Sequence, residues 1–157
     1  MALRLRPLRD DELPAFIEHG RAEYARELET QAGLTADAAR TKAETDWARL
    51  LPNAVVPEDN YLFVVEDESG ERVGDLWWAE RPNDAGEPSA FVYSIEISPE
   101  LRGRGYGKEA MALFEEDARA HGITQFNLTV LGGNEVARGL YRSLGYVERA
   151  VFMSKDG

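Results

Sequence analysis

The sequence predicts a mixed α+β fold built around one hydrophobic core. In several short segments apolar residues alternate with polar ones, as in strands, and in other segments they recur at helical spacing. The predicted order is a strand, two helices, a run of strands, and then strand, helix, strand, helix and strand. With 157 residues and 43% hydrophobic residues, the chain is large enough for one core, so we expect a single domain over residues 1–157.

The first strand and two helices are predicted from the first third of the chain. Three leucines with interleaved arginines, Leu3, Leu5 and Leu8, indicate the strand, and Asp10 or Asp11 is suited to cap the helix that follows. Apolar residues at helical spacing, Leu13, Phe16, Ile17, Tyr24 and Leu28, carry this helix to a stop near Gly33. Thr35 is predicted to cap a second helix that ends before Pro52. Both helices are highly charged, so we expect a partly exposed layer over one edge of a sheet.

Three strands are predicted next. Residues 61–66 and 72–79 are predicted to be strands joined by a turn at 67–70, which indicates a hairpin, and residues 81–89 are predicted to form a loop. In the third strand alternation places Phe91, Tyr93, Ile95 and Ile97 on one apolar face and Glu96 on the other, and Pro99 ends the strand.

The last third of the chain is predicted to alternate helices and strands. A helix is expected over residues 107–121 and a strand over residues 126–130. Asn134 is suited to cap the following helix. Residues 146–154 are predicted to close the chain as a final strand.

Between the third of these strands and its helix lies the glycine-rich run 102–108, Arg-Gly-Arg-Gly-Tyr-Gly-Lys. Three glycines let backbone N–H groups converge, and the helix start adds partial positive charge, so the run predicts a phosphate site with Arg102, Arg104 and Lys108 as counter-charges. A P-loop is excluded because Lys108 is followed by Glu109. The dinucleotide fingerprint is excluded because these glycines occupy alternate positions.

Two motifs resemble one known family. Arg-x-x-Gly-x-Gly, over Arg102, Gly105 and Gly107, resembles the acyl-CoA pyrophosphate loop of the GNAT superfamily of N-acetyltransferases. Residues 134–146 resemble its second signature, Asn-x-x-Ala-x-x-Leu-Tyr-x-x-x-Gly-aromatic. The resemblance is strong over residues 91–155 and implies a GNAT-like mixed, mostly antiparallel central sheet flanked by helices.

The resemblance also implies a donor and a reaction. The donor would be acetyl-CoA, with no metal, and the acetyl group would pass to an amine by direct attack in a ternary complex. The implied cofactor-binding residues are the backbone N–H groups of the loop and two further positions: Gly103, Arg104, Gly105, Tyr106 and Gly107 for the pyrophosphate, the Ile97 N–H for the thioester carbonyl, and Asn134 for the pantetheine amide.

Two side chains are candidates for the proton transfers of this reaction. An alkyl amine has a pKa near ~10 and must lose a proton before it attacks, so a base is needed. Glu96 is the candidate base, acting directly or through water, and the alternative interpretation is that Glu96 only faces solvent on its strand. Glu66 and Glu80 are weaker candidates. The resemblance implies that Tyr141 protonates the leaving thiolate, whereas its helical apolar stripe also allows a purely structural role.

The acceptor is predicted only as a small-molecule or peptide amine. Four aromatic residues are available for a pocket: Tyr24, Trp47, Trp77 and Trp78. Adjacent Trp77 and Trp78 must face opposite sides of a strand, so we expect one of them in the core, and the sequence does not say which. Glu23 and Glu27 would attract a cation, although a solvated helix face is the stronger interpretation.

Composition limits the other classes. A net charge of −11 argues against nucleic acid as a partner. The chain has no cysteine, which excludes a cysteine acyl intermediate, and it shows no signal peptide and no apolar run of membrane-spanning length, so we expect a cytoplasmic protein. The resemblance implies a homodimer. A catalytically silent acyl-CoA sensor or regulatory module stays open as the alternative, because it would keep the same phosphate loop.

Overall fold

A computed structural model describes residues 2–157, which form a five-stranded sheet in the order β1-β2-β3-β4-β5. The strands are β1 (Arg4–Pro7), β2 (Asn60–Glu66), β3 (Arg72–Pro82), β4 (Pro88–Ile97) and β5 (Phe126–Leu128). The first four are antiparallel to their neighbours, and β5 is parallel to β4. The predicted mixed, mostly antiparallel sheet is therefore confirmed.

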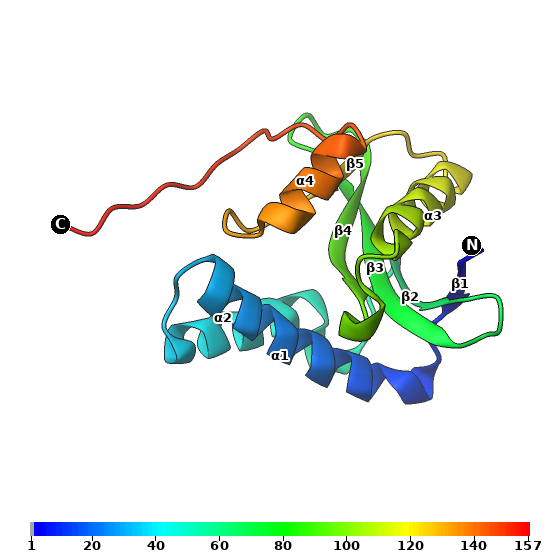
Figure 1. Cartoon of the computed structure of the whole chain (residues 1–157), viewed down its shortest axis with the longest axis horizontal. Helices are drawn as coiled ribbons and strands as arrows, with labels where there is room; N and C mark the ends of the chain where they lie inside the picture. Colours follow the sequence, from blue (N-terminus) through cyan, green and yellow to red (C-terminus); the bar gives the residue numbers. More distant parts are fainter. Residues whose placement is uncertain (1) are drawn as a thin grey trace.

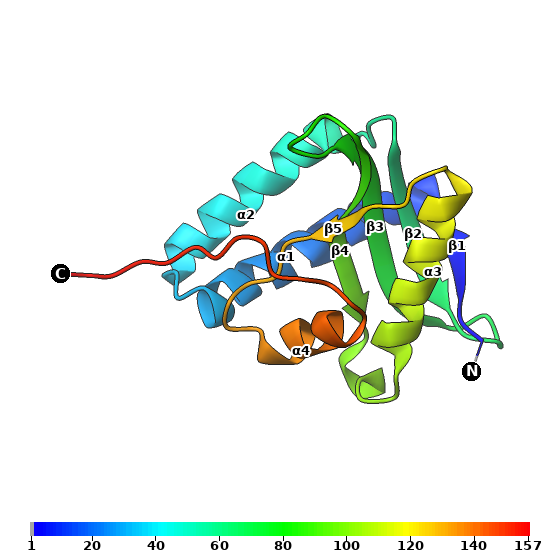
Figure 2. The same ribbon diagram turned by 90° about the horizontal axis from the view of Figure 1, so that it is seen from above.

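Helices cover both faces of the sheet (Figures 1 and 2). They are α1 (Leu13–Gln31), α2 (Ala36–Leu50), α3 (Tyr106–Ala120) and α4 (Glu135–Ser143), with short 3-10 turns at Asp10–Glu12, Pro52–Ala54 and Pro99–Leu101. The α1–α2 pair packs on one face around Phe16, Trp47 and Trp77, and α3 packs on the other around Phe114. The first two helices therefore cover a face of the sheet rather than its edge.

The cap predictions were right at two helices and wrong at one. Thr35 Oγ1 accepts a hydrogen bond from the Ala38 N–H (3.2 Å), and Asn134 Oδ1 accepts one from the Ala137 N–H (3.1 Å). Neither Asp10 nor Asp11 caps α1, because both lie in the preceding 3-10 turn. That turn is held by Glu12, whose carboxylate bonds Arg6 on β1 at 2.9 Å.

Trp77 and Trp78 lie on opposite faces of β3, and both are buried. Trp78 packs beneath α3, where its Nε1–H donates to Asp117 Oδ2 (2.9 Å). Trp77 packs beneath α1 and α2 against Trp47, with ring centroids 5.2 Å apart, and donates to Asn60 Oδ1 (2.9 Å). Each tryptophan therefore belongs to a core, one on each side of the sheet.

A β-bulge in β4 changes the predicted facing of its side chains. Trp77 pairs with Ser94 whereas Trp78 pairs with Val92, so Tyr93 is the extra residue. Phe91 and Tyr93 consequently share the α1 face with Glu96, and Ile95 packs with Val92 on the α3 face. The prediction that Phe91, Tyr93, Ile95 and Ile97 share one apolar face is wrong, because strict alternation does not hold across the bulge.

Two predicted boundaries also move. The β2–β3 hairpin is confirmed, but β3 and β4 continue pairing to Pro82 and Pro88, which reduces the expected loop over 81–89 to a turn over 83–87. In this turn Asn83 Oδ1 accepts hydrogen bonds from the N–H groups of Ala85 and Glu87, both at 2.9 Å. Strand β5 ends at Leu128, two residues earlier than predicted.

The predicted final strand over residues 146–154 is wrong. Tyr146 still packs against the core and its hydroxyl donates to Glu115 Oε2 (2.8 Å). After Glu148, which pairs with Arg138, the chain leaves the body of the molecule as an extended tail (Figures 1 and 2). Val151, Phe152 and Met153 are apolar at consecutive positions, so the segment offers no one-sided apolar face to a sheet. Phe152 is 93% exposed.

No helix within residues 2–157 is long and apolar enough to cross a membrane.

Candidate active site

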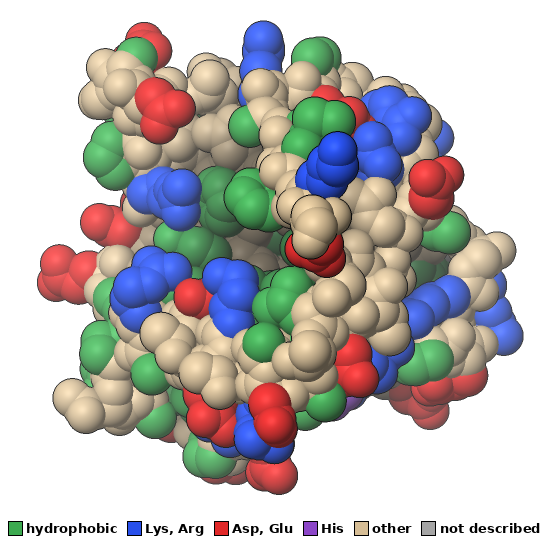
Figure 3. All heavy atoms as spheres, turned by 90° about the vertical axis from the view of Figure 1, so that its left-hand side faces the viewer, with side chains coloured by type: hydrophobic (Ala, Val, Ile, Leu, Met, Phe, Trp, Pro, Cys, Tyr) green, Lys and Arg blue, Asp and Glu red, His purple; other side chains and the backbone are tan. Residues whose placement is uncertain are grey.

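One pocket of about 430 Å³ lies between the α1–α2 layer, β4 and the segment that follows β5. Figure 3 shows the hollow on this side of the molecule, with apolar side chains inside it and charged ones around it. Its volume lies in the range of roughly 300–1,000 Å³ that is usual for small-ligand sites. The pocket therefore suits a small molecule or the end of a flexible chain.

The pocket opens where β4 and β5 separate. Strand β5 pairs with β4 only opposite Ala90–Val92, and beyond that point residues 94–96 and 129–131 both line the pocket. The Ser98 N–H donates to Val73 O on β3 (2.9 Å), so the preceding Ile97 directs its N–H away from β3, toward the separated side. The predicted carbonyl donor thus faces the gap between the two strands.

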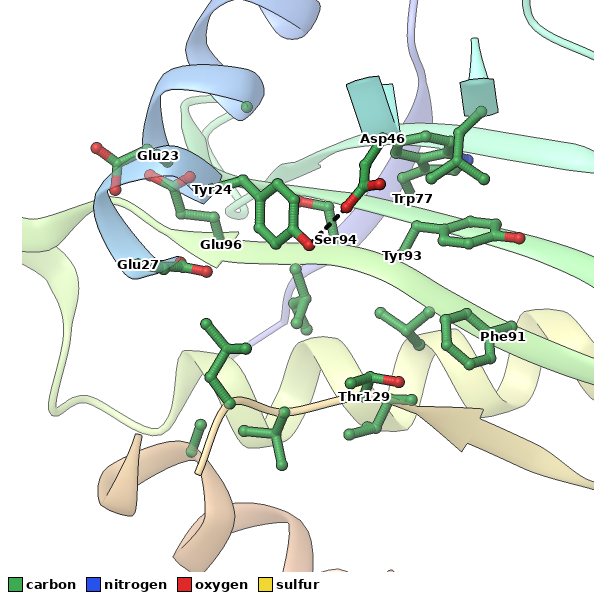
Figure 4. A pocket seen from close by; sticks show the side chains of 18 of the residues that line it. Glu23, Tyr24, Glu27, Asp46, Trp77, Phe91, Tyr93, Ser94, Glu96 and Thr129 are labelled. Carbon is green, nitrogen blue, oxygen red and sulfur yellow. Dashed lines mark hydrogen bonds between the residues drawn. The ribbon is translucent and has the colours of Figure 1, made fainter. Parts of the chain in front are cut away.

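Three carboxylates gather at one end of the pocket: Glu23 and Glu27 from α1 and Glu96 from β4 (Figure 4). Glu96 is 19% exposed, and its Oε1 lies 2.9 Å from Nε2 of His19, which is 49% exposed. Burial raises the pKa of Glu27, and the charges of Glu23 and Glu96 raise it further. This end of the pocket is therefore suited to attract a cation and to accept a proton.

The structure thus gives Glu23 and Glu27 a place in the pocket rather than on a solvated helix face alone. The signal was present in the sequence, since both follow Phe16 and Gly20 along one stripe of α1. Gly20 also lines the pocket, and a Cβ there would lie 2.2 Å from the Trp47 ring. A stripe that contains an apolar residue and such a close contact faces the protein.

Tyr141 of α4 lines the pocket together with Asn134. Burial raises the pKa of Tyr141 to about 12, with a further contribution from the charge of Glu27. Its hydroxyl makes no hydrogen bond to any of residues 2–157, so it is available to a ligand. At neutral pH the phenol is protonated and can donate a hydrogen bond or a proton.

The two weaker base candidates lie outside the pocket. Glu66 is held by Arg4 and Arg6, at 2.9 and 2.8 Å. Glu80 accepts a hydrogen bond from the Tyr61 hydroxyl (2.8 Å). Glu96 and Glu27 are the better-placed carboxylates.

Aromatic rings form the opposite end of the pocket (Figure 4). Trp77 and Phe91 flank Tyr93, with ring centroids 4.9 and 5.0 Å away. Tyr24 lies between the two ends and donates to Asp46 Oδ2 (2.9 Å), and burial followed by this hydrogen bond raises its pKa to about 12. Sequence reasoning missed Phe91 and Tyr93, because the bulge that brings them here has no marker in the sequence.

The glycine-rich loop lies between β4 and α3. Gly103 and Gly105 have φ values of 80° and 83°, and Gly105 is the N-cap of α3, so the loop uses backbone that other residues rarely adopt. The first N–H groups of α3 point into this turn without helical partners. Arg102 Nε donates to Ile97 O (3.0 Å), which ties the loop to the end of β4.

The loop therefore fits a diphosphate, since it offers N–H donors, a helix N-terminus and the exposed Arg104 and Lys108. Gly107 lies against α4, where a Cβ would be 3.4 Å from Leu140. In the part of the chain that the structure describes, no cluster of three His, Asp or Glu residues could hold a metal ion.

Comparison with known proteins adds independent findings. Residues 13–146 match the Acetyltransferase (GNAT) family. The chain is 28% identical to the uncharacterized N-acetyltransferase YycN of Bacillus subtilis over 99% of both chains, and 29% identical to YdgE of the same organism over 99% of both. The crystal structure of YycN superposes with a TM-score of 0.89 over 99% of this chain and 98% of that one. A structure of AAC(6')-Iy with a CoA bisubstrate analogue shares the fold, at 19% identity over the whole of both chains and a TM-score of 0.59.

Proposed function

The chain belongs to the GNAT family of acetyltransferases, and we propose that it transfers an acetyl group from acetyl-CoA to a primary amine by direct attack in a ternary complex. The observation that carries this proposal is the shared pocket of Glu96 and Tyr141. One residue comes from β4 and the other from α4, and both line the cavity where β4 and β5 separate. A carboxylate and a protonated phenol at one cavity supply the base and the acid that the transfer needs.

The donor side of the proposal rests on the backbone. The loop N–H groups of residues 103–107 hold the diphosphate, with Arg102, Arg104 and Lys108 nearby. Asn134 Oδ1 caps α4, which leaves its amide nitrogen to contact the pantetheine arm. Bound acetyl-CoA supplies the thioester carbonyl, and the Ile97 N–H donates to that oxygen as negative charge develops on it.

The acceptor side rests on the carboxylates. Glu23, Glu27 and Glu96 draw the ammonium group into the pocket, and Glu96 takes the proton that must leave before nitrogen attacks. His19 touches Glu96 and reaches solvent, so it provides an exit for that proton. Glu27 is the second carboxylate within the same cavity.

The atoms balance without a covalent enzyme intermediate. A nitrogen–carbon bond forms and the carbon–sulfur bond breaks. The ammonium group loses two protons, the first through Glu96 and His19 to solvent before attack and the second to Glu96 after the nitrogen–carbon bond has formed, while the Tyr141 hydroxyl proton passes to the leaving sulfur. Solvent restores both groups. The chain has no cysteine that could carry the acyl group, which favours direct transfer.

The test is acetyl-CoA-dependent thiol release across a panel of amines, since the protein itself adds no thiol background. Tyr141→Phe and Glu96→Gln should each lower kcat/KM by about 10²–10⁴-fold. Glu44→Gln, on the exposed face of α2, is the matched control and should retain full activity. Unchanged rates in both pocket variants would refute the catalytic assignments, and acetyl-CoA binding without release for any amine would favour the silent sensor.

A further inference from the structure

An arginine without an acidic partner stands at the aromatic end of the pocket. The Arg81 Cζ lies 3.9 Å from the centroid of the Phe91 ring, and its Nη1 donates to the Tyr93 hydroxyl at 3.1 Å. Among residues 2–157 no carboxylate forms an ion pair with Arg81, although the chain has 29 acidic and only 18 basic residues. The two rings thus hold a guanidinium whose charge is not neutralised.

Arg81 faces the same cavity as the candidate catalytic residues. Arg81, Phe91 and Tyr93 all line the pocket, and so does Arg49 from α2. Arg49 is only loosely paired, with Nη2 3.8 Å from Asp46 Oδ1. Two cations from different elements therefore line the same cavity as the three carboxylates. Arg81 lies at the aromatic end through its contacts with Phe91 and Tyr93, and Figure 4 shows these rings at the opposite end from the three carboxylates.

The pairing of β4 with β3 gives the separation of the two ends. Because Tyr93 is the extra residue of the bulge, the distance follows from β3, where the partners of Phe91 and Glu96 are four residues apart. At about 3.3 Å per residue, Phe91 lies about 13 Å from Glu96. A ligand that reaches both ends needs an amine and an anionic group about 10–15 Å apart. The two charged groups of a free α-amino acid share one carbon atom and are far too close.

We propose that the acceptor is a short peptide of about three residues, bound with its amino group at Glu96 and its C-terminal carboxylate at Arg81. This inference rests on the proposed acetyl transfer. An extended peptide covers at most about 3.3–3.6 Å per residue, so three residues span about 10 Å. Arginine suits this role because its planar guanidinium can bind both oxygens of a carboxylate. The rings of Trp77, Phe91 and Tyr93 provide an apolar wall for the peptide side chains.

The test compares trialanine with trialanine amide as acceptors. Both offer the same amine, but only the first has a carboxylate. We expect kcat/KM for the acid to exceed that for the amide at least tenfold in the native chain. In Arg81→Gln this preference should fall to about threefold or less, through loss of activity toward the acid.

Arg40→Gln is the matched control, because Arg40 lies on the exposed start of α2 and contacts only Asp37. It should preserve the preference for the acid, and thermal unfolding of both variants checks their folding. Equal use of acid and amide by the native chain would overturn the peptide inference while leaving acetyl transfer intact. Failure to acetylate any amine would instead overturn the proposed function.

Discussion

Gly74→Ala is the substitution whose effect follows most directly from the coordinates. Gly74 of β3 pairs with Ile97, and an added Cβ would lie 2.1 Å from the carbonyl oxygen of Glu96. Real Cβ contacts are essentially never closer than 3.0 Å, so the two strands must separate locally by about 0.9 Å. The atom that must move belongs to the backbone of the candidate base.

Two losses follow from that displacement. Overpacking of this kind costs about 1–3 kcal/mol, and for a chain of this size each kcal/mol lowers the melting temperature by about 2–4 °C. A displacement near 1 Å at a reacting group can reduce turnover about 10²-fold. We therefore expect melting roughly 2–12 °C lower and kcat/KM about 100-fold lower.

Calorimetric melting and thiol release at saturating acetyl-CoA measure the two losses. Gly139→Ala is the control, because a Cβ on the exposed face of α4 meets nothing within 4 Å and alanine favours the helix. It should match the native chain in activity and equal or exceed it in stability. If Gly74→Ala keeps kcat/KM within threefold of the native value, the proposed placement of Glu96 is wrong.

Four further outcomes are expected. Tyr141→Phe should release thiol more slowly than the native chain, and this difference should shrink as the pH rises through about 8.5, because the leaving thiolate then needs no proton. A difference that stays constant with pH would contradict the acid role. The pKa of Tyr141 is about 12, so its hydroxyl stays protonated below about pH 11, and in this range the native kcat/KM should not decline through loss of that proton. A decline of the native kcat/KM near pH 8 that is absent from Tyr141→Phe would refute this. The hydrogen bond from Arg6 lowers the pKa of Glu12 from 4.5 to about 2. The ionised Glu12 therefore stabilises the folded chain fully above pH 4.5, and this stabilisation is lost as the pH falls from about 4.5 through 2. The melting temperature of Glu12→Gln should accordingly fall less steeply with decreasing pH than that of the native chain. Parallel curves of melting temperature against pH would count against the ion pair. Brief chymotrypsin treatment should cut first after Phe152, detected as an early mass loss from the C-terminus, and a first cut elsewhere would contradict the exposed tail.

The order of the elements could be predicted from the sequence because most elements carry local signals. Thr35 and Asn134 cap their helices as their side chains suggest, and Pro99 follows the end of β4. The glycines of the phosphate loop are similarly local, since two of them require positive φ. Patterns that one segment determines by itself were therefore predictable.

What could not be predicted depends on pairing between distant segments. The bulge at Tyr93 exists only relative to the Trp77–Trp78 pair on the neighbouring strand. The tail failed as a strand because strand formation needs a partner, which a local sequence pattern does not guarantee. Glu27 differs from these cases, because its stripe with Phe16 and Gly20 on α1 indicated that it faces the protein, and only the distant segments that surround it could not be predicted.

The bulge also separates β4 into two adjoining sections with different roles in the proposed site. Phe91 and Tyr93, before and at the extra residue, shape the end of the cavity that would select the acceptor, while Glu96 and Ile97, after it, would face the reacting atoms in the proposed reaction. Substitutions in the first section can thus alter the choice of acceptor without changing the pairing of the second with β3. We expect relatives with different acceptors to diverge before the bulge and to agree after it, so that one inserted residue lets specificity evolve separately from chemistry.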